Sequence, residues 1–313
     1  MIHIFLVNPY AGQKTFADDL REKLKRIHGL QYFIFYTRYA GNEMEMVKLV
    51  QETFAGEKLR FYCCGGSGTI RNIMNGFDNL ADVELAWFPC GRTNDFLKVF
   101  GPRQEKFHVI EELINGEILP VDYIESTDGV MLNAMSLGLD ACALQKTEDY
   151  NFLRTINYEL ALNAGIAYSL FVPRLREYEI VTSNAVLTGN VTEVFFGNGT
   201  NLGGTLNFVK EGSAVDGLAN YSILMEKNRF KALPPLKALL EADFDYIHDN
   251  FYNGYSKFIR IRRKDGTPFQ VNQDGELSKL HSEWEAHIVE RGLQLVVPKG
   301  VTLYGNQTDC QKL

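Results

Sequence analysis

Three short segments combine glycines with side chains that can bind a phosphate group. They read NPYAG (residues 8–12), GGSGT (65–69) and PCGRTNDF (89–96). The glycines of the second segment can adopt positive φ and let backbone N–H groups approach an anion without a Cβ in the way. Thr69 lies at the start of a helical pattern, and a helix N-terminus favours negative charge. Each segment alone is typical of a capped turn, but the three together predict a nucleotide site.

Apolar runs precede the three segments at regular intervals. We expect buried strands over residues 2–7, 32–37, 59–64 and 83–88, and helices over residues 15–28, 42–55, 69–78 and 106–115. Strands that alternate with helices indicate βαβ units and a parallel sheet. Ligands of such sheets bind at the carboxyl ends of the strands. The three segments, and TRYAG (37–41) after the second strand, should therefore meet at one edge.

The pattern changes after about residue 123. Short strand-like runs then dominate, interrupted by helical patterns at 151–172 and 231–248. The runs are YEIVTS (178–183), VTEVFFGN (191–198), ANYSILM (219–225), KFIRIRR (257–263) and LQLVVP (293–298). Short strands separated by Gly, Asn and Asp predict an antiparallel sandwich or barrel. We expect the alternating basic residues of 257–264 to form a solvated strand face rather than a patch for lipid headgroups.

Composition excludes several classes of protein. The 313 residues carry a formal net charge of −7, whereas a dedicated nucleic-acid binder normally shows a basic stripe. The five cysteines have no CxxC spacing, and the N-terminus has no basic region before its short apolar run, so we expect reduced cytosolic thiols. The stretch 151–173 contains charged residues and asparagines and is not a good candidate for a spanning helix. These observations predict a cytoplasmic protein without a transmembrane segment.

Order and spacing of the motifs resemble the diacylglycerol kinase catalytic-domain family, which includes bacterial lipid kinases and the sphingosine and ceramide kinases. The motifs of that family, in the order of the chain, are similar to NPx[SA]G, GGDGT, PxGTxNDFAR and Nxx[SG]xGxD. This chain reads NPYAG, GGSGT, PCGRTNDFLK and NAMSLGLD (133–140), followed by NLGGTLNFVKEGSAVDGLANY and FQVNQDGEL. The resemblance covers nearly the whole chain.

The resemblance implies a two-domain lipid kinase. It implies an α/β N-terminal domain with a parallel sheet, of the kind shared by NAD kinases and diacylglycerol kinases, and an all-β sandwich C-terminal domain. The nucleotide-binding domain would span residues 1–122, and the lipid-substrate domain would span residues 123–299. The C-terminal residues from about 300 to 313 can return to the nucleotide-binding domain. The implied reaction transfers the γ-phosphate of ATP, with Mg²⁺, to a lipid hydroxyl such as that of diacylglycerol at the membrane surface. Helix 151–172 would line the acyl groove or serve only as a packing helix, and a homodimer is compatible.

The resemblance also assigns site residues. Nucleotide binding would fall to Asn8, Pro9, Tyr10, Ala11, Gly12, Thr37, Gly65, Gly66, Ser67, Gly68, Thr69, Arg92, Asn94 and Asp95. The metal would fall to Ser213, Asp216 and the carbonyl of Leu218, and the general base would be Glu276 with Asp274 beside it. Without the resemblance, a carboxylate in a D-G turn is typical of a solvated hairpin.

The departures from the family concentrate at the nucleotide segments. Ser67 replaces the aspartate of GGDGT, Arg71 and Asn72 replace Asn and Glu, and Arg92 and Thr93 replace Thr and a variable residue. We expect Ser67 to accept a backbone N–H at the start of the helix and Gly66 to have positive φ. Three interpretations remain open. The chain is an active kinase in which an arginine takes part of the metal's charge role, a catalytically impaired nucleotide- or lipid-binding homologue (a pseudokinase), or an NAD kinase-like enzyme.

Overall fold

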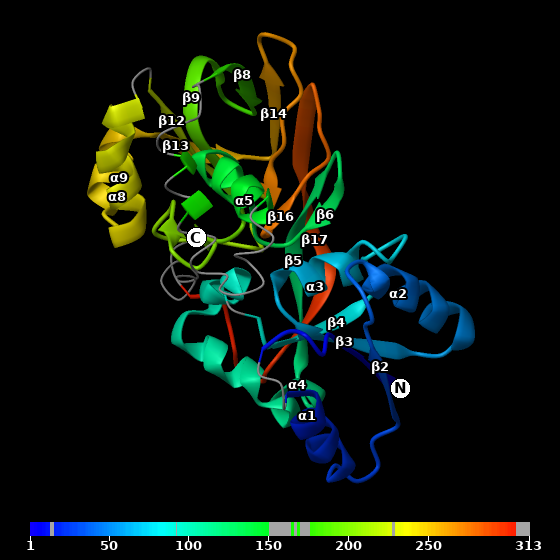
Figure 1. Ribbon diagram of the computed structural model, residues 1–313. Helices are drawn as coiled ribbons and strands as arrows, with labels where there is room; N and C mark the ends of the chain where they lie inside the picture. Colours follow the sequence, from blue (N-terminus) through cyan, green and yellow to red (C-terminus); the bar gives the residue numbers. More distant parts are fainter. Residues whose placement is uncertain are drawn as a thin grey trace. The chain divides into compact units, whose positions relative to one another are not determined.

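The computed structural model of the protein describes residues 1–12, 16–91, 93–149, 164–165, 168–169, 176–226 and 229–304. The chain divides into two compact units (Figure 1). Unit 1 comprises Met1–Tyr123, Ala214–Asp216 and Val289–Leu313, and unit 2 comprises Ile124–Ser213 and Gly217–Ile288. Strands β5 (Glu117–Ser126) and β17 (Glu283–Val297) contribute residues to both units.

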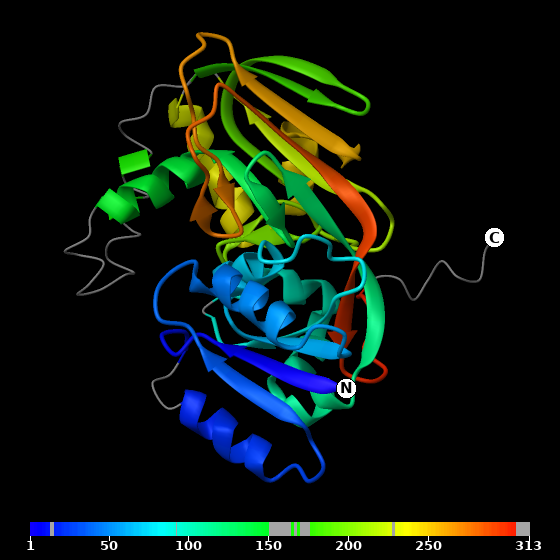
Figure 2. The ribbon, with the colours of Figure 1, turned by 90° about the vertical axis from the view of Figure 1, so that its right-hand side faces the viewer.

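Unit 1 is built on a parallel sheet with the strand order β2-β1-β3-β4-β17. The first four strands in the sequence are β1 (Ile2–Val7), β2 (Tyr32–Tyr36), β3 (Leu59–Gly65) and β4 (Glu84–Pro89). β1 lies between β2 and β3, with Ile4 opposite Phe33 on one side and Phe61 on the other (Figure 2). β1 and β4 are buried along their whole length, as expected for apolar strands covered on both faces.

Helices connect the strands of unit 1. They are α1 (Phe16–Lys25), α2 (Asn42–Thr53), α3 (Ser67–Met74), the 3₁₀ segment η1 (Asp95–His108) and α4 (Ile110–Ile114). α1 buries Leu20 and Leu24, four residues apart on one helix face, and leaves its charged residues outside. The helix predicted over 106–115 is instead the end of η1 followed by the short α4.

Unit 2 is rich in antiparallel strands. They are β6 (Gly129–Met131), β7 (Ala134–Gly138), β8 (Arg176–Thr182), β9 (Val186–Gly197), β10 (Asn201–Leu202), β11 (Leu206–Asn207), β12 (Ala219–Met225), β13 (Tyr252–Ser256), β14 (Phe258–Arg263), β15 (Asn272–Gln273) and β16 (Glu276–Leu277). β9 pairs with β8 along its first half and with β7 and β12 along its second half. The main core of the unit includes Trp284, Ile180, Ile261 and Phe196, which are buried.

Unit 2 also carries helices. α5 (Leu139–Asp149) follows β7, and η2 (Arg229–Ala232), α8 (Leu233–Glu241) and α9 (Phe244–Asn250) follow β12. The helix predicted over 231–248 is interrupted at Ala242, whose φ of 55° ends α8. Most of the predicted helix 151–172 lies outside the described residues.

The predicted fold class is confirmed: a parallel α/β region is followed by a strand-rich part. The basic residues of β14 lie on a solvated face, as predicted, because the side chains of Arg260 and Arg262 are about half exposed. They form ion pairs with Glu285 and Glu179 of the flanking strands. Within the described ranges, none of the helices has both the length and the apolar character needed to cross a membrane.

Candidate functional site: three loops and a hairpin

The loops after β1, β3 and β4 are tied together by hydrogen bonds. The Asn8 backbone N–H donates to the Cys64 carbonyl at 3.0 Å, and its side-chain amide donates to the Thr69 hydroxyl at 3.1 Å. The Cys90 N–H donates to the Gly65 carbonyl at 3.2 Å. The segments NPYAG, GGSGT and PCGRTNDF therefore meet at the carboxyl edge of the sheet, as the strand pattern predicts.

Close backbone approach explains the glycines of these loops. A Cβ built on Gly66 would lie 3.0 Å from the Cα of Gly91, and a Cβ on Gly91 would lie 2.4 Å from the Cα of Gly66. Gly12 has φ of +73°, and its Cβ would lie 2.7 Å from the Cys90 carbonyl oxygen. The expectation of positive φ at Gly66 is wrong, since its φ is −94°, and contact between loops is what requires glycine there.

Ser67 does not have the role that the sequence suggested. Gly66 occupies the N-cap of α3, Ser67 is the first helical residue, and the helix has no side-chain cap. The Ser67 Oγ is buried and has no hydrogen-bond partner in the described part of the chain. Arg71 lies one turn further along α3, on the same face as Ser67. The predicted N-cap hydrogen bond of Ser67 is therefore wrong.

The remaining predicted nucleotide residues differ in exposure. Tyr10 is 81% exposed, whereas Thr37 is buried and its N–H donates to the Val7 carbonyl at 2.9 Å. Pro9 and Ala11 belong to the turn that Asn8 begins, because the Asn8 carbonyl accepts the N–H of Ala11. Gly68 lies in the first turn of α3.

The end of the third loop is also ordered by polar contacts. Asn94 has φ of 45°, and its amide donates to the Gly91 carbonyl at 3.0 Å. Asp95 is buried and forms an ion pair with Lys98 at 3.2 Å. The loop thus keeps its shape through its own contacts, while Arg92 lies outside the described residues.

Glu43 is a buried acid beside these loops that sequence reasoning missed. It lies in the first turn of α2, and burial raises the pKa of its carboxyl above the ordinary value, partly opposed by hydrogen bonds from Gly41 and Asn72. Asn72, one of the residues that depart from the family pattern, thus contacts this buried carboxyl.

The hairpin β15–β16 carries the two predicted catalytic acids of unit 2. Asp274 and Gly275 form its turn with φ of 51° and 92°, as a tight two-residue hairpin requires. The Asp274 carboxylate is buried and accepts the N–H groups of Leu132 at 2.8 Å and Ala134 at 2.9 Å, and that of Asn133 between them. Asp274 therefore fixes the hairpin, and the half-buried Glu276 starts β16 directly after the turn.

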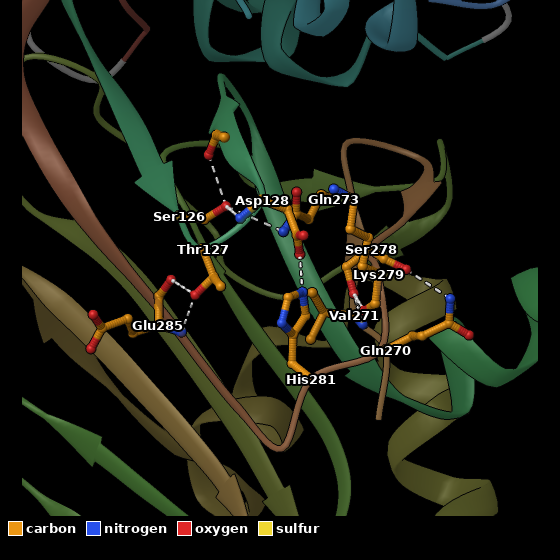
Figure 3. Close-up of polar contacts among 11 residues, drawn as sticks. Ser126, Thr127, Asp128, Gln270, Val271, Gln273, Ser278, Lys279, His281 and Glu285 are labelled. Carbon is orange, nitrogen blue, oxygen red and sulfur yellow. Dashed lines mark hydrogen bonds and ion pairs between the residues drawn. The ribbon is translucent and has the colours of Figure 1, made fainter. Parts of the chain in front are cut away.

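A polar network holds both arms of this hairpin (Figure 3). On one side, Gln273 donates to the Ser126 hydroxyl at 3.3 Å. On the other, the Val271 N–H donates to the Ser278 hydroxyl at 2.9 Å. Beyond the hairpin, a His281 ring nitrogen lies 2.7 Å from an Asp128 carboxylate oxygen. These contacts restrict the positions that Glu276 can occupy.

A second pair of acids lies at the start of α5. Asp140 accepts hydrogen bonds from the Ser136 hydroxyl at 2.5 Å and from the side-chain amide of Asn272 at 2.7 Å, and the side-chain Oδ1 of Asn272 accepts the Gly275 N–H. The Asp140 backbone N–H donates to Glu193 at 3.1 Å. Burial and then the nearby Asp140 charge raise the pKa of the Glu193 carboxyl well above its ordinary value. Sequence reasoning missed Glu193.

The Glu193 carboxyl should make stability depend on pH. Glu193 ionises near pH 4.5 in the unfolded chain but stays protonated to higher pH in the folded protein, so its contribution to stability falls as pH rises through that window. We expect Glu193→Gln to remove this loss, so that the variant's free energy of unfolding rises relative to wild type as the pH increases above about 4.5. Denaturant unfolding across this range, with the exposed Glu177→Gln as control, measures the difference. Parallel pH curves for Glu193→Gln and wild type would contradict the assignment.

A cavity of about 280 Å³ lies beside the hairpin in unit 2. Its lining includes the apolar residues Leu137, Val191 and Phe269. Gln270, which precedes the hairpin in the sequence, and Leu280, which follows it, also line the cavity. Arg176 and Arg263 also line the cavity, so its wall combines apolar side chains with cationic ones.

The predicted metal residues lie in the loop between β11 and β12. Ser213 and Leu218 are half-buried, Asp216 is exposed, and Gly217 between them has φ of 71°. A hydroxyl, a carboxylate and a carbonyl are hard oxygen donors of the kind that Mg²⁺ accepts together with water. Among the described residues, no group of three His, Cys, Asp or Glu side chains could hold a metal ion.

Comparisons with known proteins agree with this geometry. Residues 3–126 match the model of the diacylglycerol kinase catalytic domain. A Staphylococcus haemolyticus protein named "Putative lipid kinase" is 23% identical over 94% of this chain and 95% of its own length. A protein of the same name from Staphylococcus carnosus is 25% identical over 69% of this chain and 70% of its own.

Solved structures resemble the chain in fold. A crystal structure titled as a putative diacylglycerol kinase from Bacillus anthracis has a TM-score of 0.71 at 22% identity and covers 96% of both chains. A second structure, titled as a diacylglycerol kinase from the same organism, has a TM-score of 0.64 at 21% identity and covers 96% of this chain and 98% of its own. Residues 3–126 therefore match the diacylglycerol kinase catalytic domain, and this matched region contains the segment GGSGT (65–69).

Proposed function

We propose that the protein is an ATP-dependent lipid kinase that transfers the γ-phosphate of ATP to a lipid hydroxyl such as that of diacylglycerol. The observation that carries this proposal is the junction of three loops in unit 1, where Gly66 and Gly91 allow two backbones to touch at the mouth of α3. Glycine backbones next to a helix N-terminus favour a phosphate group. Unit 1 would then be the nucleotide-binding domain.

Unit 2 would supply the lipid site. A cavity lined by apolar side chains together with Arg176 and Arg263 lies beside the β15–β16 hairpin, and the same hairpin carries Glu276. In the proposed reaction Glu276 accepts the proton of the lipid hydroxyl, the hydroxyl oxygen forms a bond to the γ-phosphorus, and the bond from that phosphorus to the bridging oxygen of ADP breaks. Asp274 holds the hairpin turn in place and does not take part in the proton transfer.

Ser213, Asp216 and the Leu218 carbonyl would hold Mg²⁺, as their oxygen donors are chemically suited to it. When bound, the ion would neutralise phosphate charge. The nucleotide loops contribute one carboxylate, Asp95, and Lys98 already neutralises it.

Phosphate transfer by the purified protein tests the proposal. Wild type with ATP labelled at the γ-position should label at least one member of a panel that contains diacylglycerol, a sphingoid base, ceramide and NAD. Glu276→Gln, which lacks the proposed base, should label it far less. If NAD alone is labelled, the protein is an NAD kinase-like enzyme and the lipid kinase proposal is wrong.

A catalytically impaired, nucleotide-binding homologue is the second candidate, and Ser67 favours it. The serine lacks the negative charge that the family's aspartate brings to this loop, and its hydroxyl makes no hydrogen bond in the described part of the chain. A charge-assisted hydrogen bond contributes about 1.5–3 kcal/mol, which corresponds to about ten- to a hundredfold in rate or affinity. That loss would slow a kinase without stopping it.

A paired substitution distinguishes the two candidates. We expect Ser67→Asp alone to raise lipid phosphorylation little, because Arg71 on the same helix face would pair with the new carboxylate. Ser67→Asp with Arg71→Asn should raise the rate more than the two single changes combined, by about ten- to a hundredfold. Initial rates at several Mg²⁺ concentrations measure this. If wild type and the double variant bind nucleotide but label no lipid, the impaired homologue is correct.

A further inference from the structure

α8 has apolar residues on both of its faces. On the inner face, Ala238 and Leu239 are buried in a core cluster with Phe195 and Phe208. On the outer face, Leu233 and Leu240 are 49% and 52% exposed. They lie seven residues apart and so share one line along the helix.

Lys237 lies between these two leucines on the exposed face. It is four residues after Leu233, and its side chain is 71% exposed. A lysine can lay its methylene stem along apolar surface while its ammonium group reaches a polar layer. A single exposed leucine is ordinary on a protein surface, but two leucines in line with a lysine between them form the stripe of an interfacial helix.

The charge of the segment is opposite to that of the whole protein. Residues 227–240, KNRFKALPPLKALL, contain four basic residues and no acidic one, whereas the full chain has a net charge of −7. Lys231 at the end of η2 is exposed directly before α8. A basic segment that exposes Lys231 and Lys237 on an acidic protein is complementary to an anionic lipid surface.

We propose that the outer face of η2 and α8, formed by Lys231, Leu233, Lys237 and Leu240, docks on the surface of an anionic lipid bilayer. The leucines enter the boundary between headgroups and acyl chains, and the two ammonium groups contact lipid phosphates. This inference rests on the proposed lipid kinase function, since docking would bring the acceptor to the enzyme.

The neighbouring acids define where this docking surface ends. Glu241 lies 3.7 Å from Lys237 at the last turn of α8, and Asp243 and Asp245 follow, both exposed. An anionic surface repels these carboxylates, so we expect the contact to be confined to Lys231 of η2 and to the stripe of α8 that carries Lys237. A second copy of the chain is a poorer occupant, since a twofold contact along this stripe would bring like-charged lysines together.

Vesicle co-sedimentation of the full chain tests the docking surface. Wild type should bind vesicles of phosphatidylcholine with phosphatidylglycerol and bind pure phosphatidylcholine far less. Lys231→Gln with Lys237→Gln should lower the partition coefficient on anionic vesicles about 25-fold, at about fivefold per lysine. Leu233→Ser with Leu240→Ser should lower it about tenfold. The control Lys48→Gln with Leu49→Ser changes an exposed pair on α2 of unit 1 and should leave binding unchanged.

Phosphorylation of two forms of diacylglycerol separates docking from catalysis. The α8 variants should lose activity on vesicle-embedded diacylglycerol and keep it on a short-chain, water-soluble one. Loss of vesicle binding without any lipid phosphorylation by wild type would support docking and remove the kinase proposal. Unchanged vesicle binding in both α8 double variants would overturn the docking surface. A change from dimer to monomer in these variants at unchanged vesicle binding would assign the surface to a second copy instead.

Discussion

Glu276→Gln should lower the turnover of lipid phosphorylation by about 10²–10⁴-fold, the usual contribution of general-base catalysis. The amide keeps the size and hydrogen-bonding groups of the carboxylate but cannot accept the proton of the lipid hydroxyl. The hairpin itself should survive, because Asp274 and the β15–β16 pairing hold it independently of the proton-accepting group. Initial rates with saturating ATP and lipid measure the loss.

Two controls show whether that loss is catalytic. Nucleotide affinity of Glu276→Gln, measured by titration calorimetry, should equal that of wild type. Glu177→Gln removes the same charge from an exposed position of β8 and should leave turnover unchanged. A loss of nucleotide affinity in Glu276→Gln as large as its loss of turnover would instead make Glu276 a structural residue.

The strands of unit 1 could be predicted from sequence because each is short, apolar and followed by loop residues. The predicted runs 2–7 and 59–64 correspond to β1 and β3 almost residue for residue. Parallel strands must end at one edge, so the convergence of the loops that carry Asn8 and Gly66 followed from local pattern alone. The nucleotide-binding roles of these residues remain predictions.

The reasons for individual residues were harder to predict, since they depend on contacts between distant segments. Residue 66 must be glycine because the backbone of Gly91 lies against it. An argument about the φ of one segment does not include this contact between two loops. Glu193 belongs to no recognisable sequence motif. Its pKa is raised by burial and by the charge of Asp140, which lies 53 residues away in the sequence. Asp274 looks like a solvated turn acid in sequence, but three N–H groups some 140 residues earlier surround its carboxylate.

The exposed face of α8 illustrates a different limit. Its sequence, LPPLKALLE, is apolar except for Lys237 and Glu241, and the order of residues does not say which leucines face the core. Only the structure shows which leucines pack inside and which remain exposed beside Lys237.

Gly66→Val should abolish detectable nucleotide binding, with a loss of affinity of about a hundredfold or more. The Gly66 backbone, with φ of −94°, accepts any residue, so the substitution introduces no backbone strain. Its Cβ would already lie 3.0 Å from the Cα of Gly91, and the two methyl groups of valine extend further. The loops after β3 and β4 must therefore separate, which would displace the N–H groups at the start of α3 from a bound phosphate.

The reciprocal change should have the same effect, because the contact is mutual. A Cβ on Gly91 would lie 2.4 Å from the Cα of Gly66, so even Gly91→Ala should separate the loops and weaken nucleotide binding. Gly56→Asn is the matched control: Gly56 has φ of +85° with open space around it, and asparagine tolerates that conformation. Titration calorimetry with ATP and ADP, alongside circular dichroism to verify folding, measures all three variants. Nucleotide affinity that stays at the wild-type value in both Gly66→Val and Gly91→Ala would mean that the phosphate lies elsewhere than at the junction of the three loops.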